Sequence, residues 1–161
     1  MNEVSYEQKM HHEMGIEMNI QTWNLLEKVG RNERDDARMI SFAHASLYHW
    51  RKSHKYKPIN EQRGQWLLSH VYAVLGKSKE ALYYAKKTQK LTIEQDLKDS
   101  DRAYAYEALA RANAAIGSKY ESLKNLWNAQ MVVNDIANED DKNNFISVLE
   151  SSPWFGVKYI P

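Results

Sequence analysis

The chain contains no cysteine among its 161 residues, which excludes disulfides, zinc–thiolate sites and thiol catalysis. Glycine and proline are also scarce, with six Gly and three Pro. That is few for a sheet protein rich in turns and suits a helical protein. No stretch approaches the roughly 20 apolar residues that a membrane-spanning helix needs. The amino-terminal MNEVSYEQKMHHEMG lacks the apolar core of a signal peptide.

An excess of charge of one sign is missing as well. Lys and Arg number 22, Asp and Glu number 21, and the formal net charge is +1. Dedicated nucleic-acid-binding proteins usually carry a clear basic excess, so we expect no nucleic-acid partner. With no signal peptide or membrane span, the sequence predicts a cytoplasmic protein with a single domain over residues 1–161.

Apolar residues recur at helical spacing almost throughout, and caps and stops divide the chain. Ile20, Trp23 and Leu26 share one helix face, and Gly30 follows as a stop. Asn32 is a candidate amino-terminal cap for the next helix. The sequence predicts seven helices, over residues 16–29, 32–54, 60–76, 77–96, 99–117, 118–137 and 140–150. No strand-like alternation is present, so the expected fold class is all-α.

Two helix pairs repeat one pattern. In VYAVLGKSKEALYYA and RANAAIGSKYESLKNL, a helix ends at glycine, three residues follow, and a Glu with a small residue starts the next helix. Gly76 and Gly117, the two stops, are 41 residues apart. Self-similarity at such a period is typical of helical repeat arrays, in which stacking of neighbouring pairs supplies the core.

These residues resemble a tetratricopeptide repeat. The positions that fit are Leu68, Ser69, Tyr72, Gly76, Ala81 and Leu82 in one copy and Leu109, Ala110, Gly117, Tyr120, Ser122 and Ala129 in the next. Asn113 stands where Tyr72 stood, and Thr88 stands where a small alanine is usual. The period of 41 also exceeds the family's usual length of about 34, which implies longer helices.

The resemblance implies repeats over about 16–54, 60–97 and 99–137. The helix pairs would be antiparallel and stacked as a short right-handed superhelical array. Helix 140–150 and the apolar tail 151–161 would form a carboxy-terminal cap. The whole chain also resembles small bacterial proteins of this repeat type.

The resemblance further implies a concave groove lined by one face of each first helix. Carried onto this chain, the groove takes Arg63, Trp66 and His70 from one helix and Tyr104, Glu107 and Arg111 from the next. Helical geometry independently places the first three on one face, opposite Leu68, Tyr72 and Leu75. Arg binds carboxylates and phosphates in a forked geometry, and Trp and Tyr supply rigid contact area. We therefore expect these six residues to bind a ligand or peptide.

A second interpretation of the same residues stays open. Glu107 and Arg111 are four residues apart, so they could form only an ion pair on the helix surface. Trp66 would then be buried against the first helix pair.

The stretch FAHASLYHWRKSH, residues 42–54, holds three histidines. His44 and His49 lie about 140° apart around a helix, and His54 lies roughly 15 Å along the axis from His44. A metal site within this helix is therefore excluded. His44 and Tyr48 are expected to face the helix of Arg63, as a possible groove floor. His44 is either a buried, hydrogen-bonded link between two repeats or a general base beside His70.

The amino-terminal segment places Met10, Met14 and Met18 at helical spacing beside His11 and His12. A copper-like site is one interpretation. A methionine stripe is more typical of an apolar face that docks onto the array. We expect no metal and no cofactor.

The tail SSPWFGVKYIP is apolar, and such a segment is rarely left in water. It carries Trp154, Phe155, Val157, Tyr159 and Ile160. It is expected either to fold back as a cap or to enter a groove of its own or a neighbouring chain.

Three functions follow from these features. The sequence first predicts a non-enzymatic module that binds a protein or peptide. The alternatives are a small-ligand sensor or enzyme with a pocket near His44 and His70, and a self-associating scaffold, such as a homodimer, built on the tail.

Overall fold

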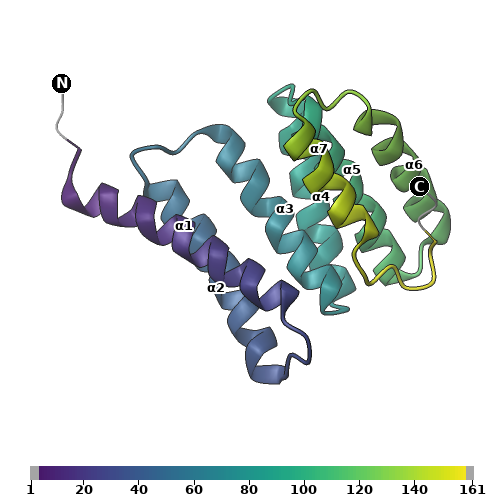
Figure 1. The fold of residues 1–161 in the computed structure, drawn as a ribbon, viewed down its shortest axis with the longest axis horizontal. Coiled ribbons are helices and arrows are strands. Elements are labelled where there is room, and N and C mark those ends of the chain that lie inside the picture. Colours follow the sequence, from purple (N-terminus) through teal and green to yellow (C-terminus); the bar gives the residue numbers. More distant parts are fainter. Residues whose placement is uncertain (1–3, 159–161) are drawn as a thin grey trace.

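A computed structural model describes residues 4–158, which form seven helices and no strand. The prediction of an all-α fold is confirmed. The helices are α1 (Tyr6–Glu27), α2 (Glu33–Lys52), α3 (Pro58–Val74), α4 (Ser78–Glu94), α5 (Asp99–Ile116), α6 (Lys119–Val133) and α7 (Glu139–Glu150). From α1 to α6, consecutive helices pack side by side as an array (Figure 1).

The turns between α3 and α4 and between α5 and α6 have the same geometry. Gly76 and Gly117 have φ of 69° and 86°, left-handed values that a glycine adopts without steric cost. In both turns the amide of the next residue donates to the carbonyl five residues back, at 2.9 Å. This closure satisfies carbonyls that the end of a helix leaves without a partner.

A buried serine joins the two helices of each of these pairs. The Ser69 hydroxyl donates to the Ala81 carbonyl at 2.9 Å, and the Ser122 hydroxyl donates to the Ala110 carbonyl at 2.8 Å. The two bonds join equivalent positions, 41 residues apart, with donor and acceptor exchanged between the helices. The construction is compatible with a helical repeat of that period.

Helix α1 begins ten residues earlier than the sequence predicted. Its amino terminus is fixed by a capping box between Ser5 and Gln8. The helix continues through Gly15. A Cβ at this position would lie 3.1 Å from Cδ1 of Trp50. Glycine makes room for the Trp50 indole, and the Ser46 hydroxyl donates to the Gly15 carbonyl at 2.8 Å. Gly15 therefore joins α1 to α2.

Helix α5 lies at the centre of contacts with α3, α4, α6 and α7. Its buried face is rich in alanine, and small side chains let neighbouring helices approach closely. The alanines are Ala103, Ala105, Ala108, Ala110, Ala112 and Ala114.

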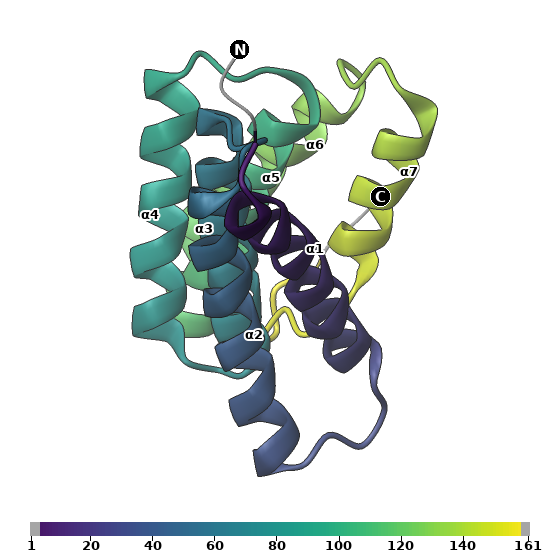
Figure 2. The ribbon, with the colours of Figure 1, turned by 90° about the vertical axis from the view of Figure 1, so that its left-hand side faces the viewer.

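Helix α7 packs against α5 on the side of the array away from α4 (Figure 2). We call this side the inner face. Phe145 of α7 is fully buried, with its ring edge against Tyr104 at a centroid distance of 4.9 Å. The chain then folds back, and the Trp154 indole donates to the Leu149 carbonyl at 2.8 Å. Tyr159 and Ile160 of the predicted apolar tail lie outside the described residues.

Within residues 4–158, none of the helices combines the length and the apolar content that crossing a membrane requires.

Candidate functional site

Part of the predicted groove is a closed, charged network. Glu107 is 0% exposed and Arg111 is 1% exposed. The Arg111 Nε donates to Glu107 Oε1 at 2.5 Å, and the Trp66 indole donates to Glu107 Oε2 at 2.9 Å. The ion pair between residues four apart therefore forms, but inside the protein rather than on the helix surface.

Arg111 also holds the carboxy-terminal segment. Its Nη1 donates to the carbonyls of Ser151 and Pro153, each at 2.9 Å, and its Nη2 donates to the Val148 carbonyl at 2.7 Å. The Trp154 ring centre lies 4.1 Å from the guanidinium carbon, within cation–π range. The last carbonyls of a helix carry partial negative charge and need donors, so a buried guanidinium is well matched to the end of α7. Glu107 and Arg111 are consequently out of reach of a ligand on the inner face.

His70 is the third buried member of this network. It is 5% exposed, stacks on Trp66 at 5.1 Å, and places Nδ1 3.6 Å from Glu107 Oε1. Burial lowers the pKa of His70, although the charge of Glu107 opposes the shift. Burial alone would raise the pKa of Glu107, but Arg111 and His70 bring it to about 2. At neutral pH the network therefore holds an ionised carboxylate, a guanidinium and a neutral imidazole.

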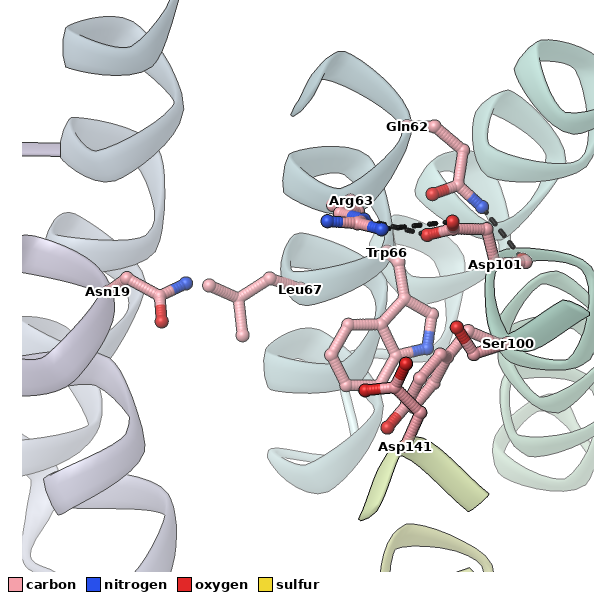
Figure 3. Close-up of a pocket in the computed structure, with 9 residues that line it drawn as sticks. Asn19, Gln62, Arg63, Trp66, Leu67, Ser100, Asp101 and Asp141 are labelled. Carbon is pink, nitrogen blue, oxygen red and sulfur yellow. Dashed lines mark hydrogen bonds and ion pairs between the residues drawn. The ribbon is translucent and has the colours of Figure 1, made fainter. Parts of the chain in front are cut away.

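Arg63 and Tyr104 lie in an open pocket beside this network. The pocket has a volume of about 250 Å³ between α1, α3, α5 and α7, and it is lined by Asn19, Gln62, Arg63, Trp66, Leu67, Ser100, Asp101, Tyr104 and Asp141. Figure 3 shows Arg63 paired with Asp101 beside the Trp66 indole, while Asn19 of α1 lies across from Leu67 of α3. The pair is bidentate, with N–O distances of 2.7 and 3.0 Å.

Two further groups set the chemistry of this pocket. Burial, and secondarily the nearby carboxylates of Glu107 and Asp141, raise the pKa of Tyr104 to about 12, so its hydroxyl is neutral. The backbone amide of Asp141 donates to the Asn138 side chain, which caps α7. Among the described residues, none forms a hydrogen bond or an ion pair with the Asp141 carboxylate. With Arg63 and Asp101 neutralising each other, the charged groups of the pocket leave one net negative charge.

A second pocket adjoins the first. It has a volume of about 290 Å³ between α1, α2 and α3 and shares Asn19, Arg63 and Leu67 with the first pocket. Ile16 and Ile20 of α1 line it and are 41% and 48% exposed. We call the two pockets together the open groove. It offers aliphatic surface at one end and aromatic and acidic groups at the other.

His44 and Tyr48 do not lie on the floor of this groove, which corrects the sequence-based expectation. His44 Nε2 lies 3.0 Å from the Tyr72 hydroxyl, so it joins two helix pairs, but its side chain is exposed rather than buried. Tyr72 follows His70 by two residues, about 200° around α3, and His44 therefore lies on the opposite side of that helix from His70. Tyr48 is 50% exposed and contacts His11 and His49.

A pocket does lie beside His70, but His44 is not one of the residues that line it. Its volume is about 400 Å³, and it lies where the ends of α1, α3 and α7 meet, with Trp23, His70 and Pro153 in its wall. The structure therefore brings His70 to a pocket without the second histidine that the enzyme interpretation requires.

The other histidines meet across α1 and α2. His11 Nδ1 and His49 Nδ1 are 2.7 Å apart, and His12 Nδ1 lies 3.1 Å from the Ser53 hydroxyl. Met10 is 37% exposed and Met14 and Met18 are half-buried, whereas the buried residues of α1 are His11, Gly15, Thr22 and Leu25. The methionines are therefore not the centre of the face through which α1 docks. In the described part of the chain, no three His, Asp or Glu side chains are arranged to hold a metal ion.

Sequence reasoning missed the acidic part of the groove. Asp101 and Asp141 were visible only as residues in the first turns of helices. Asp101 reaches Arg63 because α5 packs on α3, and Asp141 reaches the same pocket because of where α7 packs; no local pattern shows either arrangement. The comparisons do not add a functional assignment: no family model, no curated protein and no solved structure matches the chain.

Proposed function

We propose that the protein is a tetratricopeptide-like interaction module that binds a peptide segment of a partner protein in the open groove. One observation carries the proposal. The inner face is filled by α7 and the tail along α5, yet it stays open where α1, α3 and the start of α5 meet. The repeated turns at Gly76 and Gly117 support the tetratricopeptide-like assignment, as does the repeat of 41 residues.

The lining of the groove indicates what such a peptide would carry. Ile16, Ile20 and Leu67 favour an apolar side chain, since burying apolar surface is the main source of affinity in most interfaces. The net negative charge near Asp141 favours a Lys or Arg on the peptide, and aromatic faces such as that of Tyr104 also attract cations. The proposed ligand is therefore a segment with an apolar residue close to a basic one.

Binding is favoured over catalysis by how the charged groups are used. Arg63 is held by Asp101 in a bidentate pair, and Glu107 is fully buried between Arg111 and Trp66. His44 and His70 lie on opposite sides of α3. The arrangement supports a surface that recognises shape and charge.

The test is selection from a random peptide display library, followed by affinity measurements on variants that keep the fold. Ile20→Asp puts a charge at the exposed aliphatic end of the groove, so it should weaken selected peptides at least about tenfold. Ile93→Asp is the matched control, because Ile93 lies on α4 and is 69% exposed. Trp66 and Arg111 are unsuitable test positions because they are buried.

The residues enriched in the selected peptides should match the effects of the variants on binding. Selected peptides should be enriched in an apolar residue next to Lys or Arg, and Asp141→Asn should reduce the preference for the basic residue. The proposal fails if no peptide is selected, or if selected peptides bind Ile20→Asp as tightly as they bind the Ile93→Asp control.

A further inference from the structure

The outer face of α6 carries an uncovered apolar stripe. Its residues are Tyr120, Leu123, Trp127 and Met131, which are 76%, 41%, 61% and 57% exposed. At 100° per residue the four side chains fall within an arc of about 80°. We call them the α6 stripe. The buried residues of α6, including Ser122 and Ala129, lie on the opposite side of the helix.

The preceding repeat shows what this face usually carries. Shifted back by 41 residues, Tyr120, Trp127 and Met131 correspond to Lys79, Lys86 and Lys90 of α4. All three lysines are exposed, as expected for a solvated helix face. Three of the four stripe positions thus hold charge in one repeat and large apolar groups in the next, while Leu123 corresponds to Leu82. The repeat architecture itself does not account for the α6 stripe.

No part of the described chain covers the stripe. Helix α7, the nearest candidate, lies mainly against α5 on the inner face. Aromatic residues and methionine are enriched in protein interfaces, and contiguous exposed apolar patches mark interaction sites. The stripe therefore has the composition and exposure of an interface without a partner in the monomer.

We propose that the α6 stripe binds the α6 stripe of a second copy of this chain, with the two helices antiparallel around a two-fold axis. The spacing of the stripe is self-complementary in that orientation. A two-fold axis near residue 125 places Tyr120 opposite Met131 of the second copy and Leu123 opposite its Trp127. Each large group then meets an apolar group, as an interface with two-fold symmetry requires.

The flanking charges permit this approach. Glu121 and Lys124 border the stripe and lie 3.9 Å from each other. Each copy therefore presents a locally neutral pair, and two copies do not bring unpaired like charges together.

The area of the stripe sets the expected strength. An aromatic side chain buries 150–250 Å², so the exposed parts of Tyr120 and Trp127 alone amount to roughly 300 Å². With Leu123 and Met131, two copies would bury about 900 Å², which is below the 1,200–2,000 Å² typical of stable complexes. The dimer should therefore be weak, reversible and concentration-dependent.

Sedimentation of the full chain across about 10 µM to 1 mM tests the proposal, a range that covers weak affinities. The mean mass should rise toward twice that of one chain. Trp127→Lys, which installs the residue of the equivalent position in α4, should weaken association at least about tenfold. Ile93→Lys, the same change at an exposed position of α4, should leave it unchanged. Circular dichroism should show both variants folded.

A spin label tests the orientation, because the chain has no cysteine and one introduced thiol is unique. In the antiparallel pair, labels at Lys124 are offset along the axis by about 4 Å and labels at Lys119 by about 19 Å. Label separations should differ accordingly. A wild-type chain that stays monomeric up to 1 mM, a Trp127→Lys variant that dimerises like wild type, or equal label distances at the two sites would overturn the proposal.

Discussion

Arg111→Ala should be among the most destabilising single substitutions in the chain. Arg111 is 1% exposed and its guanidinium donates to the Glu107 carboxylate and to the carbonyls of Val148, Ser151 and Pro153. Its removal leaves an ionised carboxylate in the interior without its cation. It also removes the guanidinium donors to the carbonyls of Val148, Ser151 and Pro153, so the effect should spread to the segment that covers the inner face.

The magnitude follows from the burial of the pair. Breaking a buried ion pair by removing one partner costs about 3–5 kcal/mol, because the remaining charge is uncompensated. Domains unfold with only about 5–15 kcal/mol, so the loss is a large fraction of the total. For a chain of this size it corresponds to a fall in melting temperature of roughly 6–20 °C.

Urea unfolding followed by circular dichroism measures this loss. Arg63→Ala is the matched control, since Arg63 also pairs with a carboxylate, that of Asp101, but its side chain is 57% exposed. Exposed pairs contribute about 0–1 kcal/mol. The double variant Glu107→Gln with Arg111→Met removes both charges, and it should be more stable than Arg111→Ala alone. If Arg111→Ala costs no more than Arg63→Ala, the account of Arg111 as the group that holds α7 is refuted.

The same unfolding assay can test two further predictions, one on the pH dependence of stability and one on the substitution of Gly64. Burial is the largest cause that lowers the pKa of His70, which is 5% exposed, and of the half-buried His49, so the unfolded chain binds protons that the folded chain does not. The unfolding free energy is therefore highest above about pH 6.5, the usual pKa of histidine, and should fall as the pH drops below it. His49→Asn should reduce this slope, and a flat profile would contradict the pKa assignments. Gly64→Ala should destabilise by about 1–2 kcal/mol, because its Cβ would lie 2.5 Å from Cδ1 of Leu47. In a Leu47→Ala background the same change should stabilise by about 0.5–1 kcal/mol, since Ala favours a helix interior over Gly; equal effects in both backgrounds would show that the contact is unimportant.

Much of the helical architecture was predictable from local signals. Gly76 and Gly117 end their helices as expected, because a left-handed residue closes a helix and glycine adopts that conformation freely. The start of α1 also carries a local signal, the capping box of Ser5 and Gln8, but Gly15 obscures it. Gly15 looks like a helix breaker in isolation, yet the indole of Trp50 occupies the space that its missing side chain leaves. A contact with a residue 35 positions away overrode the local preference.

The sequence predicted which residues share a face at the candidate site, but it did not predict which of them are accessible to a ligand. The helical face that unites Arg63, Trp66 and His70 was found from spacing, and the partner face with Glu107 and Arg111 from the repeat. Their accessibility depends on α7 and the tail, whose docking position has no local signal. The α6 stripe, by contrast, can be recognised in the sequence once the period of 41 aligns Trp127 with Lys86.

The bonds of Arg111 to the carboxy-terminal segment have a consequence for how that segment can change. All three of its acceptors there are main-chain carbonyls, which every amino acid possesses. Side chains between Val148 and Pro153 can therefore be exchanged widely without removing these acceptors. An inserted or deleted residue would instead move the carbonyls out of register with a fixed, planar guanidinium. The bonds to Arg111 thus constrain the length of this segment, whereas packing constrains its composition only at buried positions such as Leu149.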